Sequence, residues 1–199
     1  MAGESPDNIS KTSLNKNILI ERIKKGDNKA AEILYRCHIG YLTAVCYRYI
    51  GKTEDAKDIL QDCFIKILTS IKQFEYKGED ALRSWMTRIV VNECLSFIRK
   101  NKSQEILVSY DIPGVPIKDD VHLDDSDIDT LTPEEIQSLI IKLPTGYRTV
   151  LTLFLLEGKS HKEIGELLGI AATSSASQYH RAKIMLAYMI KEKIKDKFK

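Results

Sequence analysis

The stretch SHKEIGELLGIAATSSASQYHRAK, residues 160–183, predicts two short helices joined by a tight turn. Ser160 and Glu163 match a capping box, in which a hydroxyl and a carboxylate bond to amide groups that the first turn of a helix leaves unpaired. An apolar stripe ends at Leu168, and Gly169 then supplies the backbone freedom that a sharp turn requires. The order of these signals indicates a helix-turn-helix.

The second helix of this motif is predicted to present a small, polar outer face. A helix-turn-helix places its second helix in the major groove of DNA, where each base pair shows its own pattern of donors and acceptors. Gln and Arg side chains are suited to reading that pattern. The alternative is an ordinary helical hairpin with a solvated polar face. The candidate DNA-binding residues are Ser174, Ser177, Gln178 and Arg181.

Residues 132–199 are predicted to form one small helical domain around this motif. Thr132 is an expected helix cap, followed by a proline and two glutamates in the first turn. The segment from Val150 to Leu156 is almost wholly apolar and too short to cross a bilayer, so it is expected to be core. The lysine-rich tail of the last helix either contacts phosphates or stays solvated.

Residues 104–131 are predicted to form a flexible acidic linker. Pro113, Gly114 and Pro116 interrupt the helical periodicity, and six aspartates follow between Asp119 and Asp129. Such a segment buries too little apolar surface to offset the entropy of ordering it. The linker therefore divides the chain.

Residues 14–103 are predicted to form a second helical domain. Strand signals are almost absent, and apolar residues recur every three or four positions. The long helix capped by Asp27 is expected to carry an apolar stripe, which consists of Ile33, Leu34, Tyr41, Leu42, Val45 and Tyr49. The expected fold class is therefore all-α: two small helical domains joined by a flexible acidic linker, with the helix-turn-helix in the C-terminal one.

A helix beginning at Thr53 has a complete apolar stripe for the core and an unusual opposite side. That side places an isoleucine among carboxylates, which suits docking of a basic partner. The alternative is a solvated face with one stray apolar residue. The residues concerned are Asp58, Gln61, Asp62 and Ile65.

Residues 81–102 predict a strongly basic helix that follows an aromatic loop with Phe74 and Tyr76. Bases stack on aromatic rings while Arg and Lys neutralise phosphates, so this pattern suits single-stranded nucleic acid. The alternative is that Trp85 is simply core and the basic helix end offsets the helix dipole. The cationic candidates are Arg83, Arg88, Arg99 and Lys100.

Four cysteines occur at positions 37, 46, 63 and 94, without a CxxC pair or a histidine at metal-ligand spacing. Three of them fall on apolar stripes, so buried reduced thiols are expected rather than a zinc site or disulfides. Clustered carboxylates or a nucleophile paired with a base are also not found. We therefore expect no catalytic residues, no metal and no cofactor.

The 199-residue chain has a formal net charge of +2, which excludes a uniformly basic protein. No run of about 18 apolar residues occurs, so membrane insertion is not expected. The start, MAGESPDNIS, lacks the basic and apolar parts of a signal peptide. We expect a cytoplasmic protein.

The order of these parts resembles a family, the bacterial RNA polymerase sigma factors, in particular the two-domain extracytoplasmic-function class of the sigma-70 family. Three segments carry the resemblance, and they cover most of the chain outside its ends and the linker. DAKDILQDCFIKIL is similar to the polymerase-binding helix of that family, LRSWMTRIVVNECLSFIRK to its promoter-melting helix, and LPTGYRTVLTLFLLEGKSHKEIGELLGI to the start of its C-terminal DNA-binding domain.

The resemblance implies a sigma factor with core RNA polymerase and promoter DNA as partners, and it leaves open an anti-sigma factor. It assigns polymerase binding to Asp58, Gln61, Asp62 and Ile65, and recognition of the upstream promoter element to Ser174, Ser177, Gln178 and Arg181. For promoter melting it implies the loop 73–80 with Arg83, Arg88, Asn92, Arg99 and Lys100. The alternative function is a helix-turn-helix regulator that acts without being a polymerase subunit.

One departure from the family bears on base choice. The family commonly has glycine and basic residues within the recognition helix, whereas this chain has Thr173, Ala176 and Gln178. Phosphate contacts and base preference are therefore expected to differ from those of the family.

Overall fold

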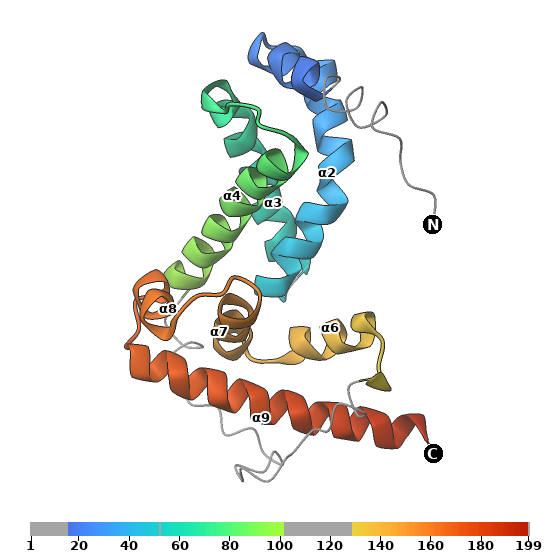
Figure 1. Ribbon diagram of the computed structural model, residues 1–199, viewed down its shortest axis with the longest axis vertical. Helices are drawn as coiled ribbons and strands as arrows, with labels where there is room; N and C mark the ends of the chain where they lie inside the picture. The colour runs from blue at the N-terminus through green and yellow to red at the C-terminus, as the bar shows by residue number, and fades with distance from the viewer. Residues whose placement is uncertain (1–15, 52, 102–128, 199) are drawn as a thin grey trace. The chain divides into compact units, whose positions relative to one another are not determined.

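The computed structural model describes residues 16–51, 53–101 and 129–198. Within these ranges the chain is helical and has no strand, which confirms the all-α prediction (Figure 1). The predicted linker lies outside the described residues except for residues 129–131. The chain divides into two compact units, one from residues 1–46 and 52–94 and the other from residues 47–51 and 95–199. In the described ranges, no helix combines the length and the apolar character that a bilayer crossing requires.

The first unit contains a helix over residues 16–24 and the long helix α2 (Asn28–Tyr49). The predicted cap of α2 is confirmed, because Oδ1 of Asp27 accepts hydrogen bonds from the backbone amides of Lys29, at 2.9 Å, and Ala30, at 3.2 Å. Next come α3 (Thr53–Ser70), the short 3-10 helix η1 (Ile71–Gln73) and α4 (Glu79–Lys100), whose last turn passes into the second unit.

The apolar stripe predicted on α2 is buried in part. Ile33 and Tyr41 are 45% and 39% exposed, whereas the other members are buried: Leu34, Leu42, Val45 and Tyr49. The buried His38 lies between Leu34 and Leu42 at four-residue spacing and completes the inward line of the helix. Apolar residues next to a stripe look alike in sequence, and only packing against neighbouring helices fixes which of them turn inward.

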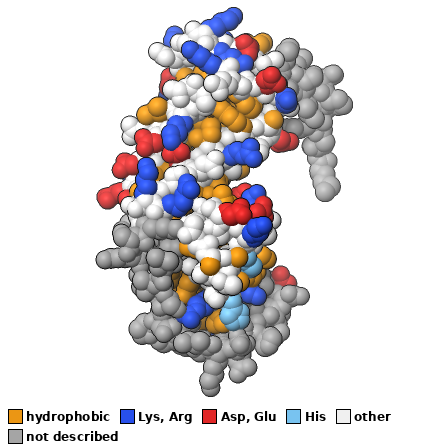
Figure 2. Space-filling view, turned by 90° about the vertical axis from the view of Figure 1, so that its left-hand side faces the viewer, with side chains coloured by type: hydrophobic (Ala, Val, Ile, Leu, Met, Phe, Trp, Pro, Cys, Tyr) orange, Lys and Arg blue, Asp and Glu red, His pale blue; other side chains and the backbone are white. Residues whose placement is uncertain are grey.

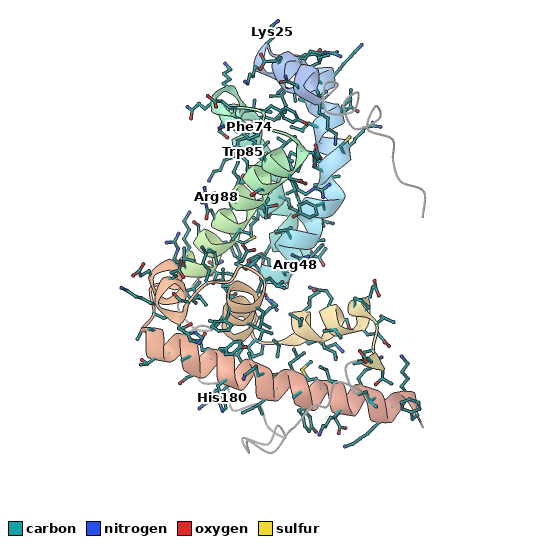
Figure 3. All side chains as sticks on the ribbon, in the orientation of Figure 1. Lys25, Arg48, Phe74, Trp85, Arg88 and His180 are labelled. Carbon is teal, nitrogen blue, oxygen red and sulfur yellow. The ribbon has the colours of Figure 1, made fainter. Side chains whose placement is uncertain are left out.

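Trp85 on α4 is half-buried rather than core. Its ring stacks on that of Phe74, with centroids 4.6 Å apart and an interplanar angle of 28° (Figure 3). The aromatic loop before α4 is therefore packed onto the helix, which limits how far it can move.

The second unit holds α6 (Pro133–Lys142), α7 (Thr145–Leu155), α8 (His161–Leu168) and α9 (Ala172–Lys197). The expected cap at Thr132 is confirmed as a full capping box with Glu135. Arg148 of α7 is buried, and its Nη1 donates to the carbonyl oxygens of Ile141 at 2.7 Å and Leu143 at 3.0 Å. These bonds satisfy carbonyls that the end of α6 leaves without intrahelical partners.

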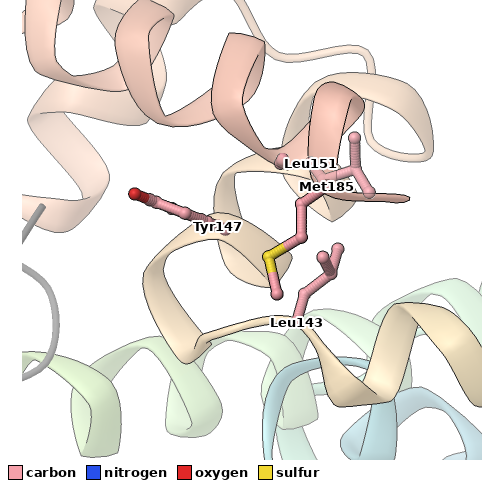
Figure 4. Packing of buried hydrophobic residues seen from close by; sticks show 5 residues of the cluster. Leu143, Tyr147, Leu151 and Met185 are labelled. Carbon is pink, nitrogen blue, oxygen red and sulfur yellow. The ribbon is translucent and has the colours of Figure 1, made fainter. Parts of the chain in front are cut away.

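The core of the second unit lies where α7 and the end of α6 meet α9 (Figure 4). The apolar segment of α7 is buried from Val150 to Leu153, as expected, but the prediction is wrong for Leu155 and Leu156, which are 58% and 59% exposed. A smaller cluster joins Leu131, Leu139 and Ile190, so the last residue of the predicted linker packs between α6 and α9. The main cluster consists of Leu143, Tyr147, Leu151, Ala182 and Met185.

Candidate nucleic-acid interface

The helix-turn-helix has the local geometry that its sequence predicts. The amide of Glu163 donates to Oγ of Ser160 at 3.3 Å, and the amide of Ser160 donates back to Oε2 of Glu163 at 2.8 Å. Gly169 ends α8 with a φ of 63°, in the left-handed region where residues with a Cβ are disfavoured. Helices α8 and α9 are thereby joined by a short, defined turn.

A second glycine, Gly165, shapes this turn and was not singled out from sequence. It is buried in α8, and a Cβ placed on it would lie 2.8 Å from the carbonyl oxygen of Ile170. The amide of Ile170 also donates to the carbonyl of Gly165 at 3.0 Å. The turn therefore packs directly on the α8 backbone, and the sequence signal was an isolated glycine inside a helical pattern.

An aromatic cluster fixes the start of α9 against α7 and α8. The ring of Phe154 lies 4.7 Å from that of His161 and 4.4 Å from that of Tyr179, between centroids. Nδ1 of His161 is 3.0 Å from Oγ of the buried Ser175. Three helices contribute to this cluster, so no single stretch of sequence predicts it.

The outward face of α9 is rotated relative to the expected one. Ser174 and Ser177 are exposed, but Gln178 and Arg181 are half-buried at the edge of that face. Exposed positions that sequence reasoning missed are Thr173 and His180, the latter labelled in Figure 3. Thr173, Ser177 and His180 recur at spacings of four and three, so they share one helix face. Ser175 and Ala182 are buried, and their burial sets this rotation.

The candidate docking face on α3 is exposed along its whole length. Asp58, Gln61, Asp62 and Ile65 all face solvent, and Ile65 is 55% exposed. Leu68, three residues further on, is also 36% exposed and extends the apolar part of this face. Ala56, Ile59, Leu60, Cys63, Phe64 and Ile67 form the buried side of the same helix.

The candidate cations on α4 are exposed but do not share one face. Arg88, Asn92 and Arg99, at spacings of four and seven, lie along one side of the helix. Arg83 instead lies over the ring of Tyr41, 5.1 Å from its centroid, and 4.0 Å from Oε1 of Glu79. Lys100 is exposed at the end of the helix.

The negative charge on α4 is partly balanced from α3. Lys66 pairs with Glu93 at 2.6 Å, so the single acid beyond the first turn of α4 has a cation beside it. Figure 2 shows Lys and Arg side chains among apolar ones over the upper part of the molecule. Within the described ranges, no group of three or more His, Cys, Asp or Glu side chains is placed to hold a metal ion.

The capping box of α8 makes the motif sensitive to acid. The hydrogen bond from the Ser160 amide, and then that from the Ser160 hydroxyl, lower the pKa of Glu163 below its ordinary value of 4.5. A carboxyl group whose pKa is lowered in the folded protein stabilises the folded state at pH values above its ordinary pKa. This stabilisation is lost as the pH falls through the lowered pKa.

We therefore expect Glu163→Gln to lower the melting temperature of the motif at pH 7 and to leave it nearly unchanged at pH 3. Circular dichroism melts of both proteins at the two pH values measure this. Glu166→Gln, on the exposed side of the same helix, serves as the control. An equal loss at both pH values would show that the ionised carboxylate is not what stabilises the cap.

Two family models match the chain in the order in which the units occur. The sigma-70 region 2 model matches residues 34–104, and the sigma-70 region 4 model matches residues 133–186. The first match contains α3 and α4 with their exposed faces, and the second contains the helix-turn-helix.

The chain is also similar to proteins that are named extracytoplasmic-function RNA polymerase sigma factors. An extracytoplasmic-function sigma factor of Bacillus subtilis, SigW, is 29% identical over 87% of this chain and 95% of its own length. The sigma-E factor of Haemophilus influenzae is 28% identical over 84% of this chain and 91% of its own length. A solved structure of a sigma factor, RpoE, with the anti-sigma factor NepR from Bartonella quintana has a TM-score of 0.44 and 22% identity, over 80% of this chain and 96% of that chain.

The occurrence of both regions in one chain, region 2 before region 4, defines the class of protein as a transcription initiation factor. The chain belongs to the sigma-70 family, in its extracytoplasmic-function class. A helix-turn-helix regulator that acts without polymerase is disfavoured, because it would leave the match over residues 34–104 without a role.

Proposed function

We propose that this protein is a dissociable subunit that binds core RNA polymerase, directs it to specific promoters and helps to open them. The observation that carries the proposal is the pair of sigma-70 family matches, regions 2 and 4, in one chain. The proposed domains are residues 14–103 and 132–199, with residues 104–131 as linker. The protein acts in the cytoplasm, an anti-sigma factor is a further partner, and no catalytic residue is assigned.

The exposed face of α3 is the proposed polymerase-binding surface. Its carboxylates, Asp58 and Asp62, attract a basic partner, while Ile65 and Leu68 offer apolar area that contact with a partner would remove from water. The core side of α3 is already filled, so nothing within the first unit requires these exposed apolar side chains.

Reversing one charge on this face should weaken polymerase binding. We expect Asp62→Lys to reduce association with core RNA polymerase at least tenfold at low salt, with a smaller loss at high salt because added ions screen the charges. Affinity is measured by titrating labelled protein with core polymerase at two salt concentrations. Glu32→Lys, an exposed site on α2 with the same charge change, serves as control. Unchanged affinity of Asp62→Lys would exclude this surface.

The α4 side that carries Arg88, Asn92 and Arg99 is the proposed site for the separated non-template strand. Guanidinium groups neutralise phosphates, and the Phe74–Trp85 stack lies at the start of the same helix. Arg83 contributes less directly, because it is already placed over Tyr41 and beside Glu79. Lys100 supplies a further cation at the end of the helix.

Helix α9 is the proposed reader of the upstream promoter duplex. In this proposal the exposed Ser174 and Ser177 enter the major groove of the DNA. The half-buried Gln178 and Arg181 lie at the edge of the same helix face. His180 is exposed on the same helix face as Ser177, and an imidazole can both donate and accept hydrogen bonds.

Replacing His180 should relax base choice rather than abolish binding. We expect His180→Ala to lose about 1–3 kcal/mol of discrimination at one position of the upstream element. Selection from a randomised duplex library by the polymerase complex measures this. Lys183→Ala, which removes an exposed cation from the same helix, should weaken binding to all sequences alike. An unchanged base preference in His180→Ala would remove this residue from the reading set.

A further inference from the structure

Two buried thiols in the first unit lie in contact with each other. Sγ of Cys94 on α4 is 3.6 Å from Sγ of Cys46 on α2, and neither residue is exposed. The predicted burial is confirmed for these two and for Cys63, while Cys37 is exposed. The contact joins positions 48 residues apart in the chain, so sequence spacing does not reveal it.

We propose that Cys46 and Cys94 are a redox modification site, at which a peroxide oxidises the pair to an intramolecular disulfide. The two sulfurs come from different helices, and their separation of 3.6 Å must close to the bonding distance of about 2 Å. Metal binding explains the pair less well, because no further His, Cys, Asp or Glu completes a metal-ligand group with them in the described residues. This inference does not depend on the proposed function.

The two sulfurs have different chemical roles. The Cys94 thiol donates a hydrogen bond to Cys46 and lowers the pKa of Cys46, whereas this bond and burial raise the pKa of Cys94. Burial raises the pKa of the third thiol, Cys63, to about 12. Since the thiolate is the reactive form, Cys46 is the sulfur that reacts first.

The reaction balances with hydrogen peroxide as the oxidant. The Cys46 thiolate, formed by loss of the thiol proton, attacks one peroxide oxygen, and the O–O bond breaks. Cys46 becomes a sulfenic acid, and the departing hydroxide takes up a proton to give the first water. The Cys94 sulfur, after losing its proton, then attacks the Cys46 sulfur. The S–S bond forms, the S–O bond breaks, and the departing hydroxide takes up a proton to give the second water. Two thiols are oxidised and one peroxide is reduced.

Burial makes this reaction depend on local opening of the helices. Cys46 and Cys94 are fully shielded, so the oxidant reaches them only when α2 and α4 separate transiently. A slow, reversible disulfide of this kind is typical of redox sensing in a reducing compartment rather than of structural cross-linking. When formed, it would tie α2 covalently to α4, the helix with the exposed arginines.

The test is peptide mapping of the full-length Cys37→Ser protein, in which the exposed thiol cannot form dimers. The protein is treated with hydrogen peroxide, then unfolded in denaturant so that buried thiols are accessible, alkylated, and digested without reduction. We expect a cross-linked peptide pair joining residues 46 and 94, lighter by two hydrogens than the reduced peptides and separated again by dithiothreitol. A further Cys63→Ser change should leave this link intact, and a further Cys94→Ser change should abolish it.

Two results would overturn the proposal. One is found with the unmutated protein, in which oxidation of the exposed Cys37 shows that the peroxide treatment was sufficient. The proposal is wrong if Cys46 and Cys94 are both still alkylated, after unfolding, in protein whose Cys37 is completely oxidised. The other is that the cross-link joins Cys63 to either residue instead. If the Cys94→Ser protein fails to fold, the map of the Cys37→Ser protein alone decides, because it identifies the linked residues directly.

Discussion

Replacing Gly165 by alanine should destabilise the helix-turn-helix by about 1–3 kcal/mol, the usual cost of an added group where no space exists. The new Cβ would meet the carbonyl oxygen of Ile170 at 2.8 Å and the amide nitrogen of Ala172 at 3.4 Å. Both are backbone atoms, so the turn itself must move. The start of α9 would then lose its position against α8.

The matched control for this change is Gly40→Ala in α2. Gly40 is also inside a helix, but an added Cβ there meets nothing within 4 Å. Alanine should therefore stabilise α2, by about 0.5–1 kcal/mol. Amide hydrogen exchange measures each helix separately, which suits a chain with two units. Slower exchange of α8 and α9 in Gly165→Ala than in the unchanged protein would contradict the packing described here.

Removing Arg88 and Arg99 together should chiefly impair strand separation. If both contact phosphates of a single strand, the slope of log affinity against log salt should fall by about 1.4, at roughly 0.7 per contact. Promoter opening by the polymerase complex should fall, while recognition of the upstream duplex by α9 persists. Permanganate reactivity of unpaired thymines measures opening, and footprinting of the upstream element measures recognition.

The control for this double change is Arg22→Ala with Arg36→Ala, which removes the same amount of positive charge from the chain. These arginines pair with Asp27 and Glu32, each at 2.7 Å, and neither belongs to α4. If both double variants reduce opening equally, the effect reflects net charge rather than a specific surface. If Arg88→Ala with Arg99→Ala loses only duplex recognition, the division between the two nucleic-acid surfaces is wrong.

Local signals in the sequence predicted the helix boundaries well. Asp27, Thr132 and Ser160 cap helices as expected, because a cap is formed by a side chain and amides only two or three residues away. The same holds for Gly169, whose positive φ is a property of the turn itself. These features need no information from the rest of the fold.

Helix rotation could not be predicted as well, because it depends on distant partners. Tyr41 looks like core in sequence but lies under the guanidinium of Arg83 at the surface. Gln178 was expected on the outer face of α9, yet burial of Ser175 and Ala182 rotates it toward the edge and brings His180 outward. The Cys46–Cys94 contact is equally non-local, since it arises only when α2 and α4 pack together.

The central claim is that this chain directs core RNA polymerase to promoters, and transcription in a purified system tests it most directly. Core polymerase alone, core with the protein, and core with Asp62→Lys are each given fragmented DNA from the same bacterium, and the transcripts are sequenced. The account predicts that the protein makes core polymerase start at a limited set of sites sharing an upstream element, and that Asp62→Lys does so much less. It would be contradicted if the protein bound DNA by itself, failed to associate with core polymerase, and left every start site unchanged.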